Sequence, residues 1–270
     1  MGLDPNSQPK AGRKPGRSNH NRPGQKKQTN ATKSSASRKP NRRATLPRQP
    51  YVEGIYSPNQ NVHFETPESW EDHHAKLLND TKRVYFSEKF IIKDAHIDAL
   101  ISVGADFCQS LRSFSAGDAE TGKGYDLTDA AIDRLAKACP NLVHVSLDGA
   151  VQLTDKSLLS LFENCPNLAF VQVSGNDNSP GRVKGTSLRK LKDNSAMAPK
   201  PVELKLSDQC EIDERLEAAM KALSAARKDL LIQAGNTHEE YGSVHYWLGG
   251  KNKFEFEVFG GGSGMGFGCW

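Results

Sequence analysis

The chain has 270 residues, of which 36 are Lys or Arg and 32 are Asp or Glu, so its formal charge is +4 at neutral pH. No apolar run approaches the length of a membrane span, and the first residues lack the apolar stretch of a secretory signal. We therefore expect an intracellular protein of the nucleus or cytoplasm with no membrane partner. The five cysteines lack CxxC spacing, which predicts free thiols rather than a disulfide framework or a metal site.

Residues 1–50 differ from the rest of the chain in charge and composition. They contain thirteen Lys or Arg and one acid, whereas the other 220 residues contain 23 basic and 31 acidic side chains. With seven of the 14 prolines and no aromatic residue, this segment buries too little apolar surface to offset the entropy of ordering it. We predict a disordered basic tail. It is either a solvated tail without a partner, a nuclear-localisation signal or a nucleic-acid-binding segment, and its candidate residues are Arg38, Lys39, Arg42 and Arg43.

Residues 51–89 are predicted to form a linker and an N-terminal capping helix. Residues 51–65 lack a helical pattern and are expected to be extended. Thr66-Pro67-Glu68 then supplies an N-cap residue, a proline at the first helical position and an acid in the first turn. Trp70 and Leu77 recur at helical spacing, so we expect this helix to cover the open end of the domain that follows.

Two neighbouring segments, 127–152 and 153–178, repeat with every landmark displaced by 26 residues. Each begins with Thr-Asp, an N-cap followed by an acid, and continues with apolar residues at helical spacing. Each helix is expected to end at Cys-Pro-Asn, beginning with Cys139 or Cys165, and a short stretch of alternating apolar residues then predicts a strand with one buried face. One such unit cannot bury its own apolar surface, so stacked copies should share a core.

Weaker copies flank this pair. Upstream, residues 93–117 contain the same succession of apolar positions. Downstream, a strand is expected at 202–206, a helix at 215–224 and a strand at 230–232, where Leu204 would correspond to Leu230. The prediction is an α/β fold of about five helix-strand units over residues 90–235, with irregular loops at 118–126 and 176–186. Residues 236–270 should form a C-terminal cap, with a strand at 254–258, and a glycine-rich end.

The unit of Thr-Asp, a helix ending at Cys-Pro-Asn-Leu and a Leu-x-x-Val-x-Leu strand resembles the cysteine-containing leucine-rich repeat. This family is built like ribonuclease inhibitor and is common among receptors of F-box ubiquitin ligases. The resemblance implies a short solenoid with a parallel sheet on its concave side and helices outside. It also implies protein binding, often in ubiquitin ligation or cell-cycle control. Ala150 and Asn176 stand where the family has a second cysteine, and residues 66–90 show no F-box-like pattern.

The strand residues that alternate with the core positions should face the concave surface. One predicted row across the strands contains Ser113, His144, Phe170, Glu203 and Asp229, and the next contains Ser115, Ser146, Gln172, Lys205 and Leu231. Phe170 is the leading candidate because aromatic residues are common at binding hot spots, although a loop or the linker 51–65 would be expected to cover it in a protein that does not bind there. The candidate protein-binding residues are His144, Phe170, Gln172, Glu203 and Lys205.

Motifs of common enzymes are absent from the sequence: there is no GxSxG, no HExxH and no GxxxxGK(S/T). We therefore predict a non-enzymatic protein without a cofactor, a metal or a catalytic residue. The expected function is a scaffold or adaptor that binds an unidentified protein. Five short strands expose only a few hundred Å², below the ~800 Å² per partner of a specific interface, so the loops 118–126 and 176–186 should contribute. The alternative is a nucleic-acid or chromatin-associated protein anchored by its tail.

Overall fold

The computed structural model describes residues 51–117, 126–176, 179–209, 214–238, 242–249 and 253–259. The chain divides into two units, Met1–Thr45 and Leu46–Trp270, and every described residue belongs to the second. The predicted tail, with Arg38, Lys39, Arg42 and Arg43, therefore lies outside the described residues.

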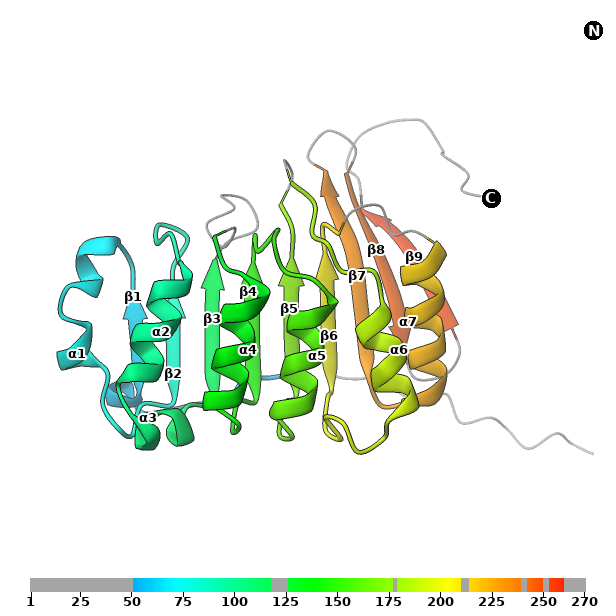
Figure 1. The fold of residues 1–270 in the computed structure, drawn as a ribbon. Helices are drawn as coiled ribbons and strands as arrows, with labels where there is room; N and C mark the ends of the chain where they lie inside the picture. The colour runs from blue at the N-terminus through cyan, green and yellow to red at the C-terminus, as the bar shows by residue number, and fades with distance from the viewer. Residues whose placement is uncertain are drawn as a thin grey trace, which may run out of the picture. The chain divides into compact units, whose positions relative to one another are not determined.

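The described part of the chain contains one nine-stranded sheet, in which each strand pairs with the strand that follows it in the sequence (Figure 1). The first seven strands are parallel and the last two are antiparallel additions. The parallel strands are β1 (Asn61–Phe64), β2 (Arg83–Phe86), β3 (Ser113–Gly117), β4 (His144–Asp148), β5 (Phe170–Ser174), β6 (Glu203–Ser207) and β7 (Leu231–His238). The additions are β8 (Gly242–Gly249) and β9 (Lys253–Phe259), and the predicted strand 254–258 is confirmed as part of β9.

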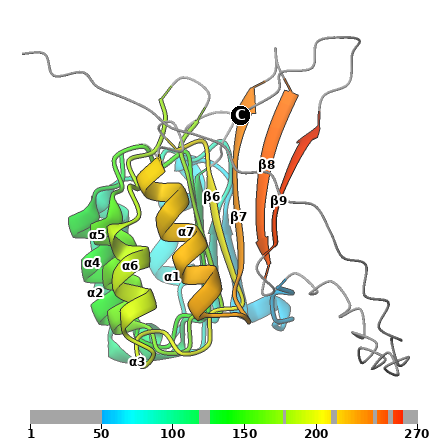
Figure 2. The same cartoon turned by 90° about the vertical axis from the view of Figure 1, so that its right-hand side faces the viewer.

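The larger helices form one layer on one face of the sheet, as Figure 2 shows for α2 and α4 to α7. The α-helices are α1 (His73–Lys76), α2 (Asp94–Ser102), α3 (Ala105–Ser110), α4 (Asp129–Ala138), α5 (Asp155–Asn164), α6 (Thr186–Asp193) and α7 (Glu214–Ala226). Two 3-10 helices, η1 (Pro58–Gln60) and η2 (Pro67–Trp70), precede them. A single core of buried apolar side chains runs from Val62 on β1 to Ala234 on β7.

The predicted helix-strand unit is confirmed for the strongest pair of repeats. Helices α4 and α5 begin after Thr128 and Thr154, whose side chains accept hydrogen bonds from backbone N–H groups of the first turn. Both helices end at the repeated cysteines. The register places His144 beside Phe170 on β4 and β5, which is the displacement of 26 residues seen in the sequence.

The Asp that begins each of the helices α2, α4 and α5 also links one unit to the next. Asp94 accepts hydrogen bonds from the backbone N–H and the hydroxyl of Thr128, at 3.0 and 2.6 Å. Asp129 binds the same two groups of Thr154, at 2.8 and 2.7 Å. Asp155 accepts from the backbone N–H and the hydroxyl of Ser187, at 2.9 and 2.7 Å. These three carboxylates form a ladder between the helices of neighbouring units, which we call the aspartate ladder.

The parallel sheet begins before residue 90, where the first repeat was predicted. Strands β1 and β2 add two strands to the five expected, and the helical part of 66–89 is limited to η2 and the four-residue α1. Each added strand has only two buried positions, Val62 and Phe64 on β1 and Val84 and Phe86 on β2. Such short alternation is too weak a pattern to separate a strand from a loop.

The predicted register between the last two parallel strands is wrong by two residues. Leu204 pairs with Ile232 rather than corresponding to Leu230. Leu230, Leu231 and Ile232 are three consecutive apolar residues, so their pattern is compatible with more than one register. Leu231 therefore lies beside Glu203 and Gln233 beside Lys205, while Asp229 lies in the turn before β7.

Candidate protein-binding face

The face of the sheet opposite the helix layer, here called the open face, holds all five predicted binding residues on three adjacent strands. His144, Phe170 and Glu203 lie side by side at the first positions of β4, β5 and β6. Gln172 lies beside Lys205 in the next row. The alternation of each strand requires this arrangement, since the residues between them are buried in the core.

Phe170 is nevertheless only 6% exposed, because the chain's own residues 51–56 cross the open face above it. The Tyr51 ring centroid lies 5.5 Å from that of Phe170 and 5.6 Å from that of His144. The His144 and Phe170 rings stack on each other at 4.4 Å with only 4° between their planes. The structure therefore shows that the linker 51–65 covers Phe170. This was the predicted alternative to an exposed binding hot spot.

Polar contacts hold this covering segment at two further points. The backbone N–H of Tyr51 donates a hydrogen bond of 2.7 Å to Oε2 of Glu203. The Glu53 carboxylate accepts a hydrogen bond from the Ser113 hydroxyl and lies 3.3 Å from Nη2 of Arg83. The segment thus crosses from β6 to β2, and in Figure 1 it passes behind the strands, on the side away from the helices.

Three buried polar atoms under or beside the covering segment have no hydrogen-bond partner: Arg83 Nε, His144 Nδ1 and Glu203 Oε1. Glu203 is 1% exposed, and Oε1 lies 3.3 Å from Nζ of Lys205, an ion pair without hydrogen-bond geometry. Burial is the main cause that lowers the pKa of His144, which favours the neutral imidazole. Burial also raises the pKa of Tyr51 to about 12, with smaller contributions from Tyr56 and Glu53.

Gln172 belongs to a polar network rather than to the aromatic stack. Its Nε2 donates to Oδ1 of Asp148 at 2.5 Å, and Asp148 also accepts from the hydroxyls of Ser146 at 2.8 Å and Ser174 at 3.1 Å. The Ser174 hydroxyl in turn accepts from the N–H of Gly149 at 2.9 Å. Lys205 joins the other group, with its Nζ 5.4 Å from the centroid of the Phe170 ring.

Tyr51, Glu53 and Arg83 also belong to this face, and no sequence pattern predicted them. The contact from Tyr51 to Glu203 joins residues 152 positions apart, and that from Glu53 to Ser113 joins residues 60 apart. The one local signal was an aromatic residue and an acid in a linker, at positions 51 and 53, and this signal does not specify where they bind.

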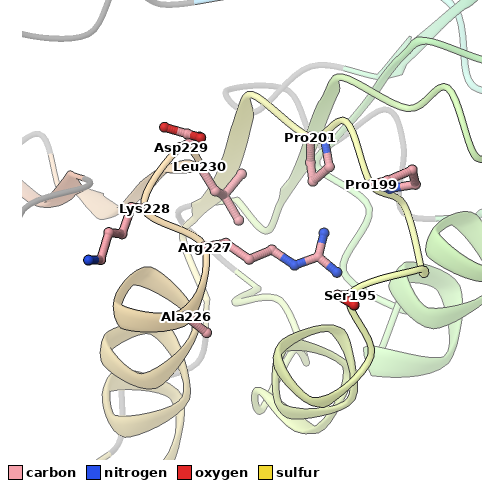
Figure 3. Close-up of a pocket in the computed structure, with 8 residues that line it drawn as sticks. All are labelled: Ser195, Pro199, Pro201, Ala226, Arg227, Lys228, Asp229 and Leu230. Carbon is pink, nitrogen blue, oxygen red and sulfur yellow. The ribbon is translucent and has the colours of Figure 1, made fainter.

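A hollow of about 340 Å³ lies at the turn between α7 and β7 (Figure 3). Arg227 points across it toward the loop that follows α6. The guanidinium of Arg227 donates four hydrogen bonds of 2.6 to 2.8 Å to backbone carbonyls of Leu191, Asn194, Met197 and Ala198. Because these donors anchor the loop, the hollow is explained by the packing of the loop.

The thiols on the helix side are buried at equivalent positions of consecutive units: Cys108, Cys139 and Cys165. The Cys165 Sγ donates weakly to the carbonyls of Ala136 and Cys139, both at 3.7 Å. Burial raises the pKa of Cys165 to about 12, so its thiol is protonated at neutral pH. Within the described ranges there is no cluster of three His, Cys, Asp or Glu side chains suited to a metal ion.

The described helices include none with the length and apolar character needed to cross a membrane. No protein-family model matches the sequence, and a comparison with curated proteins finds no match either.

Proposed function

We propose that this chain is a leucine-rich-repeat solenoid of the cysteine-containing, ribonuclease-inhibitor-like kind, and that it is a non-enzymatic scaffold whose open face binds another protein. The observation that carries the proposal is the buried row of His144, Phe170 and Glu203, which an extended segment already contacts through both aromatic and polar groups. A face that holds one extended segment in this way has the features needed to hold a partner's segment.

The arrangement of the helices and strands favours a solenoid and disfavours a doubly wound sheet. Doubly wound folds have helices on both faces and a point where the strand order reverses. Here the seven parallel strands follow in sequence order, and the larger helices lie on one face. The 26-residue repeat and the aspartate ladder also favour stacking of similar units, in which each unit contacts mainly its neighbours.

The resemblance to receptors of ubiquitin ligases suggests the setting in which such a scaffold works. We propose an adaptor in ubiquitin ligation or cell-cycle control, in the nucleus or the cytoplasm. The open face alone offers less area than a specific interface usually buries, so the loops 118–126 and 176–186 would complete it.

Site-specific photo-crosslinking in cells tests the binding face. A photoreactive amino acid replaces Gln172 on the open face of the full chain, and a matched variant carries it at Lys156, an exposed position of α5. We expect a defined protein adduct from position 172, identified by mass spectrometry, and no such adduct from position 156. Equal adducts from both positions, or none from either, contradict binding through the open face.

A second candidate function, nucleic-acid or chromatin association, is favoured by the charge of residues 1–50, with thirteen basic residues and one acid. It predicts that the full chain binds DNA or RNA with an affinity that falls steeply with salt. Replacing Arg38, Lys39, Arg42 and Arg43 together by Ala should weaken binding and reduce the dependence on salt. An unchanged salt dependence in a filter-binding or anisotropy titration contradicts a role for these four residues.

A further inference from the structure

The covering segment contacts the open face through Tyr51 and Glu53, while its apolar side chains stay exposed. Tyr51 and Glu53 face the sheet, whereas Val52 between them is 82% exposed and Ile55 is fully exposed. Apolar side chains that stabilise a fold are normally buried, so these two contribute little to the core. From Tyr51 to Glu53 the contacting and exposed side chains alternate, as they do in an extended peptide on a binding surface.

The open face also has more binding capacity than residues 51–56 use. Arg83 Nε, His144 Nδ1 and Glu203 Oε1 are buried without hydrogen bonds while the segment is in place. Buried polar atoms in native proteins are almost always paired, and unpaired ones are costly. These atoms lie along the first row of the face, on strands β2, β4 and β6, under or beside the covering segment. Glu203 Oε1 lies 3.3 Å from Nζ of Lys205, so the buried polar atoms that remain available to a ligand are Arg83 Nε and His144 Nδ1.

We propose that residues 51–56 are an intramolecular stand-in for a partner, and that the open face binds an extended peptide of another protein carrying an aromatic residue followed two positions later by Asp or Glu. This inference rests on the proposed protein-binding function and names the chemistry of its partner. The aromatic side chain stacks on His144 and Phe170, its backbone N–H binds Glu203, and the acid pairs with Arg83 and Ser113. Binding requires displacement of Tyr51 and Glu53, so the free protein is self-blocked.

The loss of affinity that the tethered segment causes for an external peptide follows from its effective concentration. A tethered segment competes at an effective concentration on the order of millimolar, so a segment with intrinsic affinity near 100 μM would weaken an external peptide by about tenfold. Removing the tethered contacts should therefore strengthen binding of an external peptide by about tenfold.

The test uses the full chain and a fluorescein-labelled peptide with the sequence of residues 51–56, Tyr-Val-Glu-Gly-Ile-Tyr, as the probe. Fluorescence anisotropy compares wild type with the double variant Tyr51→Ala and Glu53→Ala, in which the face is opened. We expect the opened variant to bind about tenfold more tightly than wild type. A matched control, Val52→Ala with Ile55→Ala, alters the same segment at its exposed positions and should bind as weakly as wild type.

Two further variants, one of the protein and one of the probe, test the binding site and the peptide motif. Phe170→Ala in the opened variant should abolish binding, and a probe with Ala in place of its first Tyr and its Glu should not bind. Circular dichroism and thermal unfolding check that each variant is folded. Equal binding by wild type and opened variant, no binding by either, or binding that survives Phe170→Ala in a folded protein overturns the proposal.

Size-exclusion chromatography with light scattering distinguishes a partner from a second copy of this chain. If wild type forms a dimer at high concentration that the opened variant does not form, the ligand is residues 51–56 of another copy, and the proposed external partner is wrong. Photo-crosslinking from position 172 separates this inference from the broader function. Adducts at that position with no gain in peptide binding on opening the face refute the stand-in and leave protein binding intact.

Discussion

The two faces of the sheet are built from the same strands but differ in how completely their polar groups are paired. On the helix side, apolar side chains fill one core, and two carboxylates of the aspartate ladder bind the N-cap residues Thr128 and Thr154. On the open face, a row of aromatic and charged residues is buried under six residues of the same chain, and three buried polar atoms lack a hydrogen bond. The helix side is therefore closed by the repeats themselves, whereas the open face is closed by a segment outside the repeats.

The largest expected difference between the faces is in the cost of removing a buried side chain. Leu147→Ala leaves a cavity behind a fully buried residue of β4 and should lower the free energy of unfolding by about 2–5 kcal/mol. Ser146→Ala, the adjacent residue on the open face, should change it by less than about 1 kcal/mol. Urea denaturation measures both, and similar losses would remove the distinction between the faces.

The aspartate ladder should contribute to stability on the helix side. Asp129→Ala removes hydrogen bonds to the backbone N–H and the hydroxyl of Thr154 and to the hydroxyl of Ser157. Leaving these groups unpaired should cost about 2 kcal/mol. Asp193→Ala is the control, because its side chain is 69% exposed and pairs with the adjacent Lys192, and we expect a change within about 0.5 kcal/mol. Equal losses would show that the ladder contributes no more than surface charge.

Phe170→Ala sharpens the comparison because Phe170 is as buried as many core residues but lies under a displaceable segment. We expect a loss of about 1 kcal/mol, well below the 3–5 kcal/mol typical of a Phe in a closed core. Limited proteolysis of the same variant should cut within residues 51–56 faster than in wild type. A loss as large as that of Leu147→Ala would mean that residues 51–56 are an integral part of the fold.

The smallest expected effect is in the pH dependence of Tyr51. Its pKa is raised to about 12 when folded, mainly by burial, so the folded state retains the phenol proton above pH 10, where an unfolded tyrosine loses it. The contribution of the protonated Tyr51 to stability is therefore fully present below about pH 10 and is lost as the pH rises toward 12. Spectrophotometric titration of wild type against Tyr51→Phe should show one phenol titrating near pH 12, and a difference centred at 10 would contradict its burial.

Repetition made much of the fold predictable from local sequence. Landmarks displaced by 26 residues predicted helices α4 and α5, strands β4 and β5 and the pairing of His144 with Phe170. Strand alternation also predicted that His144, Phe170 and Glu203 lie in one row, as they do. Each of these inferences uses the spacing within one unit, and similar units must stack in the same register to share a core.

Where the repeat was weak, only the tertiary structure decided the arrangement. Strands β1 and β2 are too short to show a period, and three consecutive apolar residues left the register of β7 ambiguous. The sequence did not predict that Asp129 binds Thr154, because the Thr-Asp motif was fully explained as the start of a helix.

The sequence by itself determined which strand residues face away from the core, because side chains alternate along every strand. Only the tertiary structure determined what covers them. The covering contacts join Tyr51 to Glu203 and Glu53 to Ser113, across 152 and 60 positions of the chain. No local pattern encodes such a contact, since it depends on the path of a non-repetitive segment across a surface that exists only after the repeats have stacked.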